Sequence, residues 1–232
     1  MKTIGLIGGL TWQSSKFYYD FLNQLVVEKM GGSHSAKILM SSVDFAPIEK
    51  LSFENNWTKI GELMAIEAKR LENAGADLII IGSNTINMVS DYVTAAISIP
   101  FVHIADATGN AIKKIGLSKV GLLGTKFTME RDFYKSILKN SYGLEVLIPN
   151  EKERDTLQYM IYNELAKGDF SESSKNKCLD IIGNLISNGA QGIILGCTEL
   201  PILIPEGEIP VHSFDTTMIH SRAAVEAAIN SI

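Results

Sequence analysis

Two segments in different halves of the chain end in nearly the same way, and this repeat limits the fold more than any other feature. Residues 73–83 read NAGADLIIIGS, and residues 187–197 read SNGAQGIILGC. Each contains a continuous apolar run, which is typical of a strand buried on both faces of a parallel sheet. The alignment makes Ser83 and Cys197 equivalent positions, each directly after a strand.

Two further pairs of similar segments occur in the same order along the chain. Residues 2–8 resemble residues 118–124, so that both halves begin with a similar strand. Ile99-Pro100 resembles Ile209-Pro210, and an aspartate follows each pair. A repeat of about half the chain is longer than a solenoid unit and predicts two similar lobes.

Apolar runs alternate with segments of helical spacing, which predicts an α/β fold with parallel sheets. The predicted strands are residues 3–7, 38–43, 78–81, 100–104, 120–123, 144–148 and 192–195. The predicted helices cover residues 17–25, 60–74, 107–115, a segment from Met129 onward, 156–166, 174–187 and 219–229. We expect residues 1–105 plus 209–232 to form the first lobe and residues 106–208 the second.

The composition narrows the class of protein. With 232 residues, 46% of them hydrophobic, the chain can bury a substantial core. Its net charge of −5, without a run of Lys or Arg, argues against nucleic-acid binding. No segment approaches the roughly 18 apolar residues of a membrane span, and the N-terminus lacks the pattern of a signal peptide. The sequence predicts a cytoplasmic protein.

The two cysteines have different surroundings. Cys178 lies in a helical pattern with apolar neighbours, which predicts a core residue. Cys197 follows a buried strand and precedes Thr198-Glu199. Ligands of open α/β sheets bind beyond the carboxyl ends of strands, so Cys197 and Ser83 would both line a cleft if the lobes face one another. Two proton carriers on opposite sides of a carbon can invert its configuration, because one removes a proton from one face and the other returns a proton to the opposite face.

Cofactors and metals are not predicted. The turn Gly5-Leu6-Ile7-Gly8-Gly9 lacks the spacing of a dinucleotide loop, and no histidine has metal-ligand spacing. Amides of this turn and the hydroxyl of Thr11 suit a substrate carboxylate, although Thr11 also suits a helix cap. His220 is expected either to orient a cleft residue or to pack where the lobes join.

Several ordered motifs resemble the aspartate/glutamate racemase family over nearly the whole chain. They are Gly8-Gly9-Leu10-Thr11-Trp12-Gln13-Ser14-Ser15, Val43-Asp44-Phe45, Ser83-Asn84-Thr85, residues 121–129, residues 196–201 and residues 214–220. The resemblance implies a pseudo-twofold pair of lobes with the active site in the cleft between them. It also implies pyridoxal-independent proton transfer without any cofactor, and a homodimer.

Carried over by position, the family pattern makes Cys197 the surviving catalytic thiol and Ser83 its opposing proton carrier. The predicted contacts to the amino-acid substrate are Thr11, Asn84, Thr85, Thr125, Thr128 and Thr198, to which we add Glu199.

The sequence departs from the family pattern at two places. The usual first motif is C-N-T-x-H, whereas this chain has Ser83 and Asn87 at its ends. The cation that would bind an acidic side chain is not evident, and Lys126 and Lys175 are the candidates. Serine has no thiolate form and needs a neighbouring base, although it can donate a proton. We therefore predict a racemase of aspartate or glutamate whose activity is reduced or direction-biased by Ser83.

Two other functions stay open at this stage. One is cofactor-free decarboxylation or isomerisation of a small diacid, because a single protonation then suffices. The other is a non-catalytic amino-acid-binding relic that has lost its proton relay.

Overall fold

The structure is a computed structural model that describes residues 1–229. The chain divides into two compact units. Unit 1 contains Met1–Ile104 and the segment from Thr217 onward, and unit 2 contains Ala105–Thr216. Each unit has a parallel sheet flanked by helices, which confirms the predicted α/β class.

The sheet of unit 1 has the order β2-β1-β3. Strand β1 (Ile4–Gly8) pairs in parallel with β2 (Ile38–Ser42) and with β3 (Leu78–Ile81). Every residue of β1 and β3 is buried, because the central strands carry apolar side chains toward both faces. Parallel pairing places the carboxyl ends of all three strands at one edge of the sheet.

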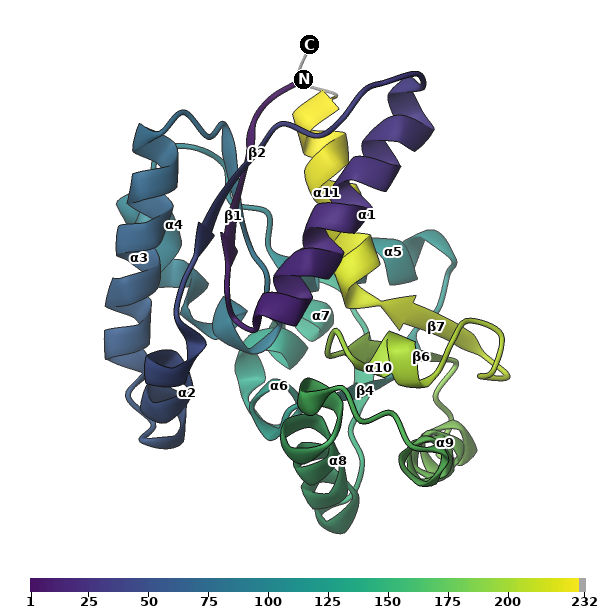
Figure 1. Ribbon diagram of the computed structural model, residues 1–232. Helices are drawn as coiled ribbons and strands as arrows, with labels where there is room; N and C mark the ends of the chain where they lie inside the picture. Colours follow the sequence, from purple (N-terminus) through teal and green to yellow (C-terminus); the bar gives the residue numbers. More distant parts are fainter. Residues whose placement is uncertain (230–232) are drawn as a thin grey trace. The chain divides into compact units, whose positions relative to one another are not determined.

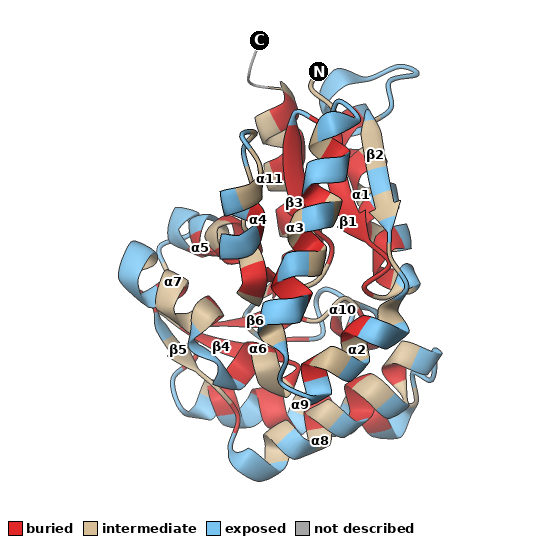
Figure 2. Ribbon diagram, turned by 90° about the vertical axis from the view of Figure 1, so that its left-hand side faces the viewer, coloured by how far each residue is buried: buried red, intermediate tan, exposed pale blue. Residues whose placement is uncertain are grey.

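Helices flank both faces of this sheet (Figure 1), whose strands β1 and β3 are coloured as buried in Figure 2. A hydrophobic cluster packs on each face. On one face, Ile4 and Leu6 pack with α1 (Trp12–Met30) and α11 (Thr216–Ile229). On the other face, Ile7 and Ile79 pack with α3 (Trp57–Asn73) and α4 (Ser90–Ala96). The alternation along β1 follows the period of two that a strand imposes on its side chains.

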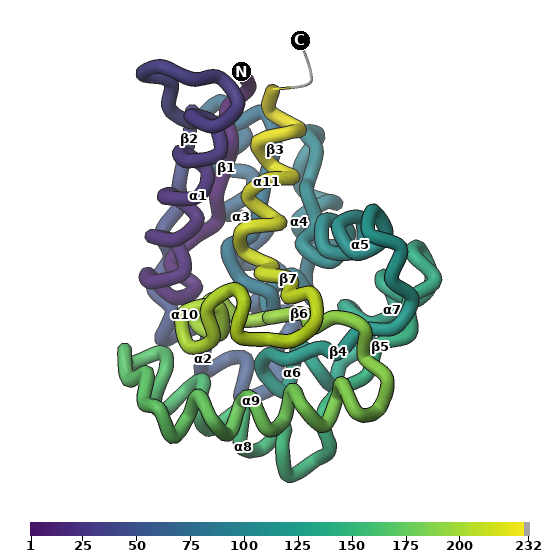
Figure 3. The backbone as a smooth tube through the Cα atoms, turned by 90° about the vertical axis from the view of Figure 1, so that its right-hand side faces the viewer, coloured from purple at the N-terminus to yellow at the C-terminus, as the bar shows by residue number. Residues whose placement is uncertain are grey.

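The sheet of unit 2 has the order β5-β4-β6-β7. Its strands are β4 (Lys119–Gly124), β5 (Glu145–Leu147), β6 (Gly192–Gly196) and β7 (His212–Asp215), and all three pairings are parallel. Figure 3 shows α8 (Glu151–Asn163) and α9 (Glu172–Ser187) on one side of this sheet. The helices α5 (Ile104–Lys114) and α7 (Asp132–Tyr142) lie on the other side.

Local signals explain several helix ends. Helix α8 begins with a capping box, in which the side chain of Asn150 accepts from the Glu153 amide and the Glu153 side chain accepts from the Asn150 amide. The helix predicted from Met129 is two helices, α6 (Lys126–Glu130) and α7, because Arg131 between them has an extended backbone.

One predicted strand is wrong. Residues 100–104 form a single bridge between Phe101 and Ile79, and α5 already begins at Ile104. The Ile79 amide donates to the Pro100 carbonyl and the Val102 amide donates to the Ile79 carbonyl. Since Pro100 has no N–H to donate, the ladder does not extend toward the N-terminus.

The second predicted lobe boundary differs from the observed one. Residues 209–216 were assigned to the first lobe, but β7 pairs with β6 and therefore belongs to unit 2. The segment His212–Asp215 is short and has few apolar side chains, so the sequence pattern did not predict a strand there. Residues 230–232, which the prediction also assigned to the first lobe, lie outside the described residues.

Short elements that the sequence pattern did not predict complete the fold. They are α2 (Phe45–Phe53), the 3-10 helix η1 (Thr85–Val89), α4, the 3-10 helix η2 (Leu165–Lys167) and α10 (Leu200–Leu203). Two of them, η1 and α10, directly follow the strand ends that carry Ser83 and Cys197.

Candidate functional site

The turn after β1 is held by its own side chains. Gly9 has φ of +78°, and a Cβ there would lie 2.1 Å from the Val43 carbonyl oxygen, so only glycine fits. The Gly9 amide donates to Ser15 Oγ at 2.7 Å, and Ser15 Oγ donates to the Thr11 carbonyl. Thr11 caps α1, because its Oγ1 accepts from the Ser14 amide at 3.3 Å. The capping role predicted for Thr11 is therefore present.

Ser83 lies at the same edge of the unit 1 sheet, because β3 and β1 are adjacent. The Gly82 amide donates to the Ile7 carbonyl, which ties the two strand ends together. Ser83 is half-buried, and its Oγ accepts from the Ile86 amide at 3.4 Å. Because the oxygen is an acceptor in this bond, the hydroxyl hydrogen is available for donation.

The rest of this motif forms the first turn of η1. Asn84 is buried and Thr85 is half-buried. Asn87, which the sequence analysis did not place in the site, is fully buried, and its Nδ2 donates to the Ser83 carbonyl at 2.7 Å. The only sequence signal for Asn87 was its place at the end of the motif, where the family has histidine.

In unit 2 the corresponding edge is formed by the ends of β4 and β6. Gly124 and Gly196 pair in register, and a Cβ on Gly196 would lie 2.6 Å from the Leu123 carbonyl oxygen. Thr125 and Cys197 follow these glycines directly. Thr125 caps α6 through the Thr128 amide, at 3.2 Å, and the hydroxyls of both threonines are 3.2 Å apart. The structure thus brings Thr125, Thr128 and Cys197 to one strand edge.

Cys197 faces a carboxylate from its own turn. Its Sγ donates to Glu199 Oε2 at 2.9 Å, and Thr198 Oγ1 donates to the same oxygen at 2.7 Å. Glu199 is 5% exposed, so this carboxylate is close to the thiol in a region with little water. The turn is closed by the Leu200 amide, which donates to the Cys197 carbonyl.

This arrangement keeps the thiol protonated at neutral pH. Burial raises the pKa of Cys197 well above its ordinary value, and the charge of Glu199 and its hydrogen bond raise it further. The amides of Glu199 and Thr198 act in the opposite direction. A thiolate at Cys197 therefore requires that its proton pass to an acceptor or that a positive charge approach Glu199.

The two lysines predicted as candidates for a second carboxylate are both paired with carboxylates of the protein. Lys126 Nζ forms an ion pair with Asp155, and Gln158 accepts from the Lys126 amide. Lys175 Nζ lies 2.5 Å from Glu208 Oε2. These pairs raise the pKa of both lysines, each first through the hydrogen bond to its carboxylate.

Two other groups have structural surroundings. Cys178 is fully buried in α9, and burial raises the pKa of its thiol to about 12. His220 is fully buried in unit 1, where it contacts Tyr18 Oη through Nδ1 at 2.8 Å and the Val102 carbonyl through Nε2 at 2.7 Å. Because a carbonyl only accepts, Nε2 carries the proton and Tyr18 donates to Nδ1.

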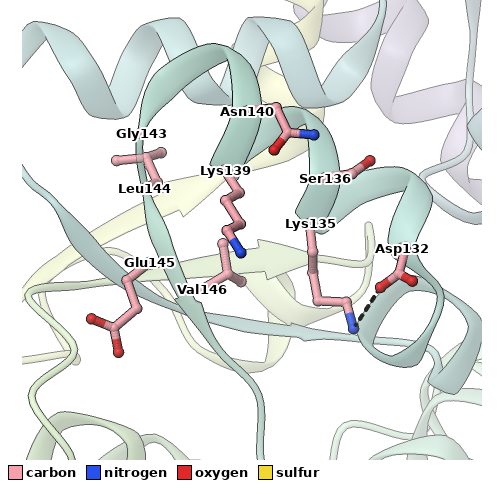
Figure 4. Close-up of a pocket in the computed structure, with 9 residues that line it drawn as sticks. All are labelled: Asp132, Lys135, Ser136, Lys139, Asn140, Gly143, Leu144, Glu145 and Val146. Carbon is pink, nitrogen blue, oxygen red and sulfur yellow. Dashed lines mark ion pairs between the residues drawn. The ribbon is translucent and has the colours of Figure 1, made fainter.

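A hollow of about 850 Å³ on unit 2 lies between α7 and β5 (Figure 4). Figure 4 shows Lys135 beside Asp132, with which it forms an ion pair of 3.5 Å. The lining residues, which include Lys139 and Glu145, contain no thiol and none of the predicted site residues. The hollow therefore does not coincide with the strand edges that carry the predicted site residues.

Two further features of residues 1–229 concern membranes and metal ions. No helix in that range is long and apolar enough to cross a bilayer. No group of three or more His, Cys, Asp or Glu side chains in the same range is arranged to hold a metal ion.

The chain is similar to known proteins over most of its length. A family model described as Asp/Glu/Hydantoin racemase matches residues 7–224. A crystal structure of a putative Asp/Glu racemase from Yersinia pestis is 43% identical, with a TM-score of 0.93 over 99% of this chain and 100% of that chain. An aspartate racemase homologue from Pyrococcus horikoshii OT3 is 39% identical, with a TM-score of 0.85 over 98% and 99%.

A curated relative gives a more distant match. The broad specificity amino-acid racemase RacX of Bacillus subtilis is 27% identical over 170 residues, which cover 71% of each chain.

Proposed function

The chain belongs to the Asp/Glu/Hydantoin racemase family, as its motifs predicted, and on that basis we propose that it racemises an amino acid by cofactor-independent proton transfer between Cys197 and Ser83. The observation that carries this proposal is the contact of 2.9 Å between Cys197 Sγ and Glu199 Oε2. A thiol with an adjacent carboxylate is a proton carrier whose state a bound substrate can change.

Glu199 has two roles in the proposed mechanism. The ammonium group of the substrate binds near Glu199 and offsets part of the charge that, together with burial, raises the pKa of Cys197. Cys197 then transfers its proton to Glu199 Oε2, and the thiolate takes the α-proton. The thiol is re-formed, the electron pair stays on the α-carbon, and Glu199 releases its extra proton to solvent, which balances the proton that solvent later returns to Ser83.

Ser83 completes the inversion from the opposite face of the α-carbon. Its hydroxyl donates a proton to the carbanion, and solvent restores the hydroxyl proton. The reaction requires that the α-carbon come within reach of Cys197 and Ser83 together. The hydroxyls of Thr11, Thr85, Thr125, Thr128 and Thr198 and the amide of Asn84 are proposed to bind the substrate's carboxylate and ammonium groups.

The serine makes the two directions unequal in their individual steps. The enantiomers have equal free energy in solution, so kcat/KM for interconversion must be the same in both directions. The individual kcat and KM values differ, and so does exchange without inversion, because a thiolate is a stronger base at neutral pH than a serine hydroxyl. We expect faster α-proton exchange from the enantiomer that Cys197 deprotonates.

We propose aspartate or glutamate as the substrate, supported by the family match and by the aspartate racemase homologue of similar fold. An acidic side chain that used Lys126 or Lys175 would have to replace Asp155 or Glu208 as the ion-pair partner. Both enantiomers of aspartate and glutamate should therefore be compared with asparagine and glutamine, which have nearly the same shape without the charge.

The decisive experiment is incorporation of solvent deuterium at the α-carbon, followed by NMR and by chiral chromatography. Inversion with deuterium at the α-carbon, at unequal initial exchange rates, is expected. Binding without exchange of the α-proton would overturn the racemase proposal. Equal and fast exchange from both enantiomers would overturn the assigned difference between Cys197 and Ser83.

We also propose a cytoplasmic homodimer. Trp12 and Tyr19 lie two turns apart on α1 and are 67% and 57% exposed, and Met40 on the edge strand β2 is 47% exposed. We expect these exposed apolar side chains to contribute to a contact between two copies of the chain. Light scattering should give a dimer mass that Trp12→Glu reduces, and a monomeric wild-type chain would contradict the proposal. Cell fractionation checks the location.

A further inference from the structure

The turn that carries Ser83 is held by Asn87, which stands where the family motif usually has histidine. Asn87 lies in η1 and has no exposed surface. Its Nδ2 donates to the Ser83 carbonyl at 2.7 Å and to the Ile81 carbonyl at 3.4 Å. These are the carbonyls at the end of β3 and just beyond it, where the chain leaves the sheet.

The orientation of the Asn87 amide follows from its neighbours. Both groups that it faces are carbonyl oxygens, which only accept, so the nitrogen must point toward them. The oxygen, Oδ1, is buried and has no hydrogen-bond partner within residues 1–229. An apolar side chain of the same size would remove this unsatisfied oxygen, but it would leave the Ser83 carbonyl without its side-chain donor. The structure therefore keeps an amide donor at the Ser83 carbonyl although the same amide carries an unsatisfied buried acceptor.

Ser83 is fixed at two points as a result. Asn87 holds its carbonyl, and the Ile86 amide donates to its Oγ at 3.4 Å. Fixing the carbonyl limits rotation of the Ser83 backbone, while the amide contact occupies an acceptor site on the hydroxyl and leaves the hydrogen to point elsewhere. The two contacts together set the direction in which Ser83 donates.

We propose that Asn87 is a positioning residue that holds Ser83 in its proton-donating orientation, an inference that rests on the proposed racemase function. It acts through Ser83 and does not touch the substrate. Loss of the Asn87 amide should therefore impair delivery of the second proton and leave the removal of the first proton by Cys197 intact.

The test measures the ratio of inversion to exchange with retention at the α-carbon. A general loss of folded protein lowers both rates equally and leaves this ratio unchanged. With the faster-exchanging enantiomer in deuterated water, inversion requires Ser83, whereas exchange with retention requires only Cys197. Asn87→Leu removes both donors and should lower the ratio of inversion to retained exchange by about tenfold to a hundredfold. Asn87→His keeps an N–H donor and should restore much of the ratio.

Asn23 supplies a matched control in the same unit. Its Nδ2 donates to the Tyr19 carbonyl at 2.8 Å and its Oδ1 accepts from the Ala36 amide at 3.0 Å. Asn23→Leu should lower the melting temperature without changing the ratio. If Asn87→Leu does not fold, Asn87→Ala, which leaves room for water at the Ser83 carbonyl, is measured in its place.

The outcomes separate the two proposals. An active wild-type chain whose ratio is unchanged in Asn87→Leu or Asn87→Ala overturns the positioning role alone. A wild-type chain that exchanges no α-proton overturns the racemase function and the positioning role with it. A lower ratio in the Asn87 variants, beside an unchanged ratio in Asn23→Leu, supports the proposal.

Discussion

The ends of β3 and β6 have similar backbones and different acid–base surroundings. Strand β6 ends in Gly196 and strand β3 is followed directly by Gly82, and each glycine leads through a turn into a short helix. In unit 2 the first side chain after the glycine is a thiol that donates to a buried carboxylate. In unit 1 it is a hydroxyl whose oxygen accepts from a main-chain amide. Equivalent positions in a repeat therefore carry different proton chemistry.

The difference teaches that the repeat determines where Ser83 and Cys197 lie in their units, while neighbouring residues determine the acid–base properties of each side chain. Cys197 has Glu199 two residues further on, which can take its proton. At the corresponding position after Ser83 stands Thr85, which has no charge. This difference is the basis for our proposal that the unit 2 strand end supplies a base and the unit 1 strand end supplies a donor.

The largest expected effect comes from removing the thiol. Cys197→Ala should lower α-proton exchange from both enantiomers by about a thousandfold or more, because the base of one direction and the acid of the other are lost together. Deuterium incorporation measures this. Cys178→Ala is the control, since that thiol is buried in α9 and should affect only the melting temperature. If α-proton exchange in Cys197→Ala stayed at the wild-type rate, the proposed roles of the two strand ends would be wrong.

Removing the charge beside the thiol should have the next largest effect. In Glu199→Gln the charge that helps to raise the pKa of Cys197 is gone, so the pKa falls and alkylation by iodoacetamide begins at lower pH. At the same time kcat should fall about a hundredfold, because the proton acceptor is lost. Glu145→Gln, at an exposed carboxylate of the same unit, should change neither quantity. An unchanged alkylation profile would remove Glu199 from the mechanism.

Making the two strand ends alike is the third way to examine the comparison. Ser83→Cys gives both units a thiol, and kcat/KM should rise about tenfold or more, equally in both directions. The difference in exchange rate between the enantiomers should shrink. Ser136→Cys, which adds a thiol on α7, controls for a new thiol elsewhere. No change in Ser83→Cys would argue that unit 1 takes no part in proton transfer.

The sequence predicted the strand ends better than their surroundings. Continuous apolar runs and the glycines after them located β3, β6, Ser83 and Cys197, because buried parallel strands have a strong local signal. Strand β7 was missed because its residues, among them His212 and Asp215, gave no strand signal, and pairing with β6 overrides a weak pattern.

The side-chain contacts of Glu199, the two lysines and Asn87 could not be predicted from the sequence, for a related reason. Glu199 was added to the predicted substrate contacts because it follows Cys197-Thr198, but its bond to Cys197 depends on side-chain rotamers. Asp155 and Glu208 lie far along the chain from Lys126 and Lys175, with which they form ion pairs. No local spacing in the sequence indicates such pairs. Asn87 was noted only as a departure from a motif, because its bond to the Ser83 carbonyl exists only in the folded turn.

The effect with the least influence on catalysis concerns stability and again separates the units. Burial lowers the pKa of His220 to about 4, with the nearby His103 acting in the same direction and the Val102 carbonyl opposing it. Between pH 6.5 and 4 the unfolded chain binds a proton that the folded chain does not, so the free energy of unfolding falls as pH falls through this range. The total loss is about 3 kcal/mol for this group.

His220→Gln should remove that part of the pH dependence, because glutamine can donate to Val102 and accept from Tyr18 without titrating. Urea unfolding from pH 7 to pH 4 measures the change, and His34→Gln, at an exposed histidine, is the control. Since His220, Tyr18 and Val102 all belong to unit 1, hydrogen exchange at pH 5 should show lost protection in α1 and α11 before α9. Equal loss in both units would mean that the unit carrying Ser83 is not separately sensitive to acid.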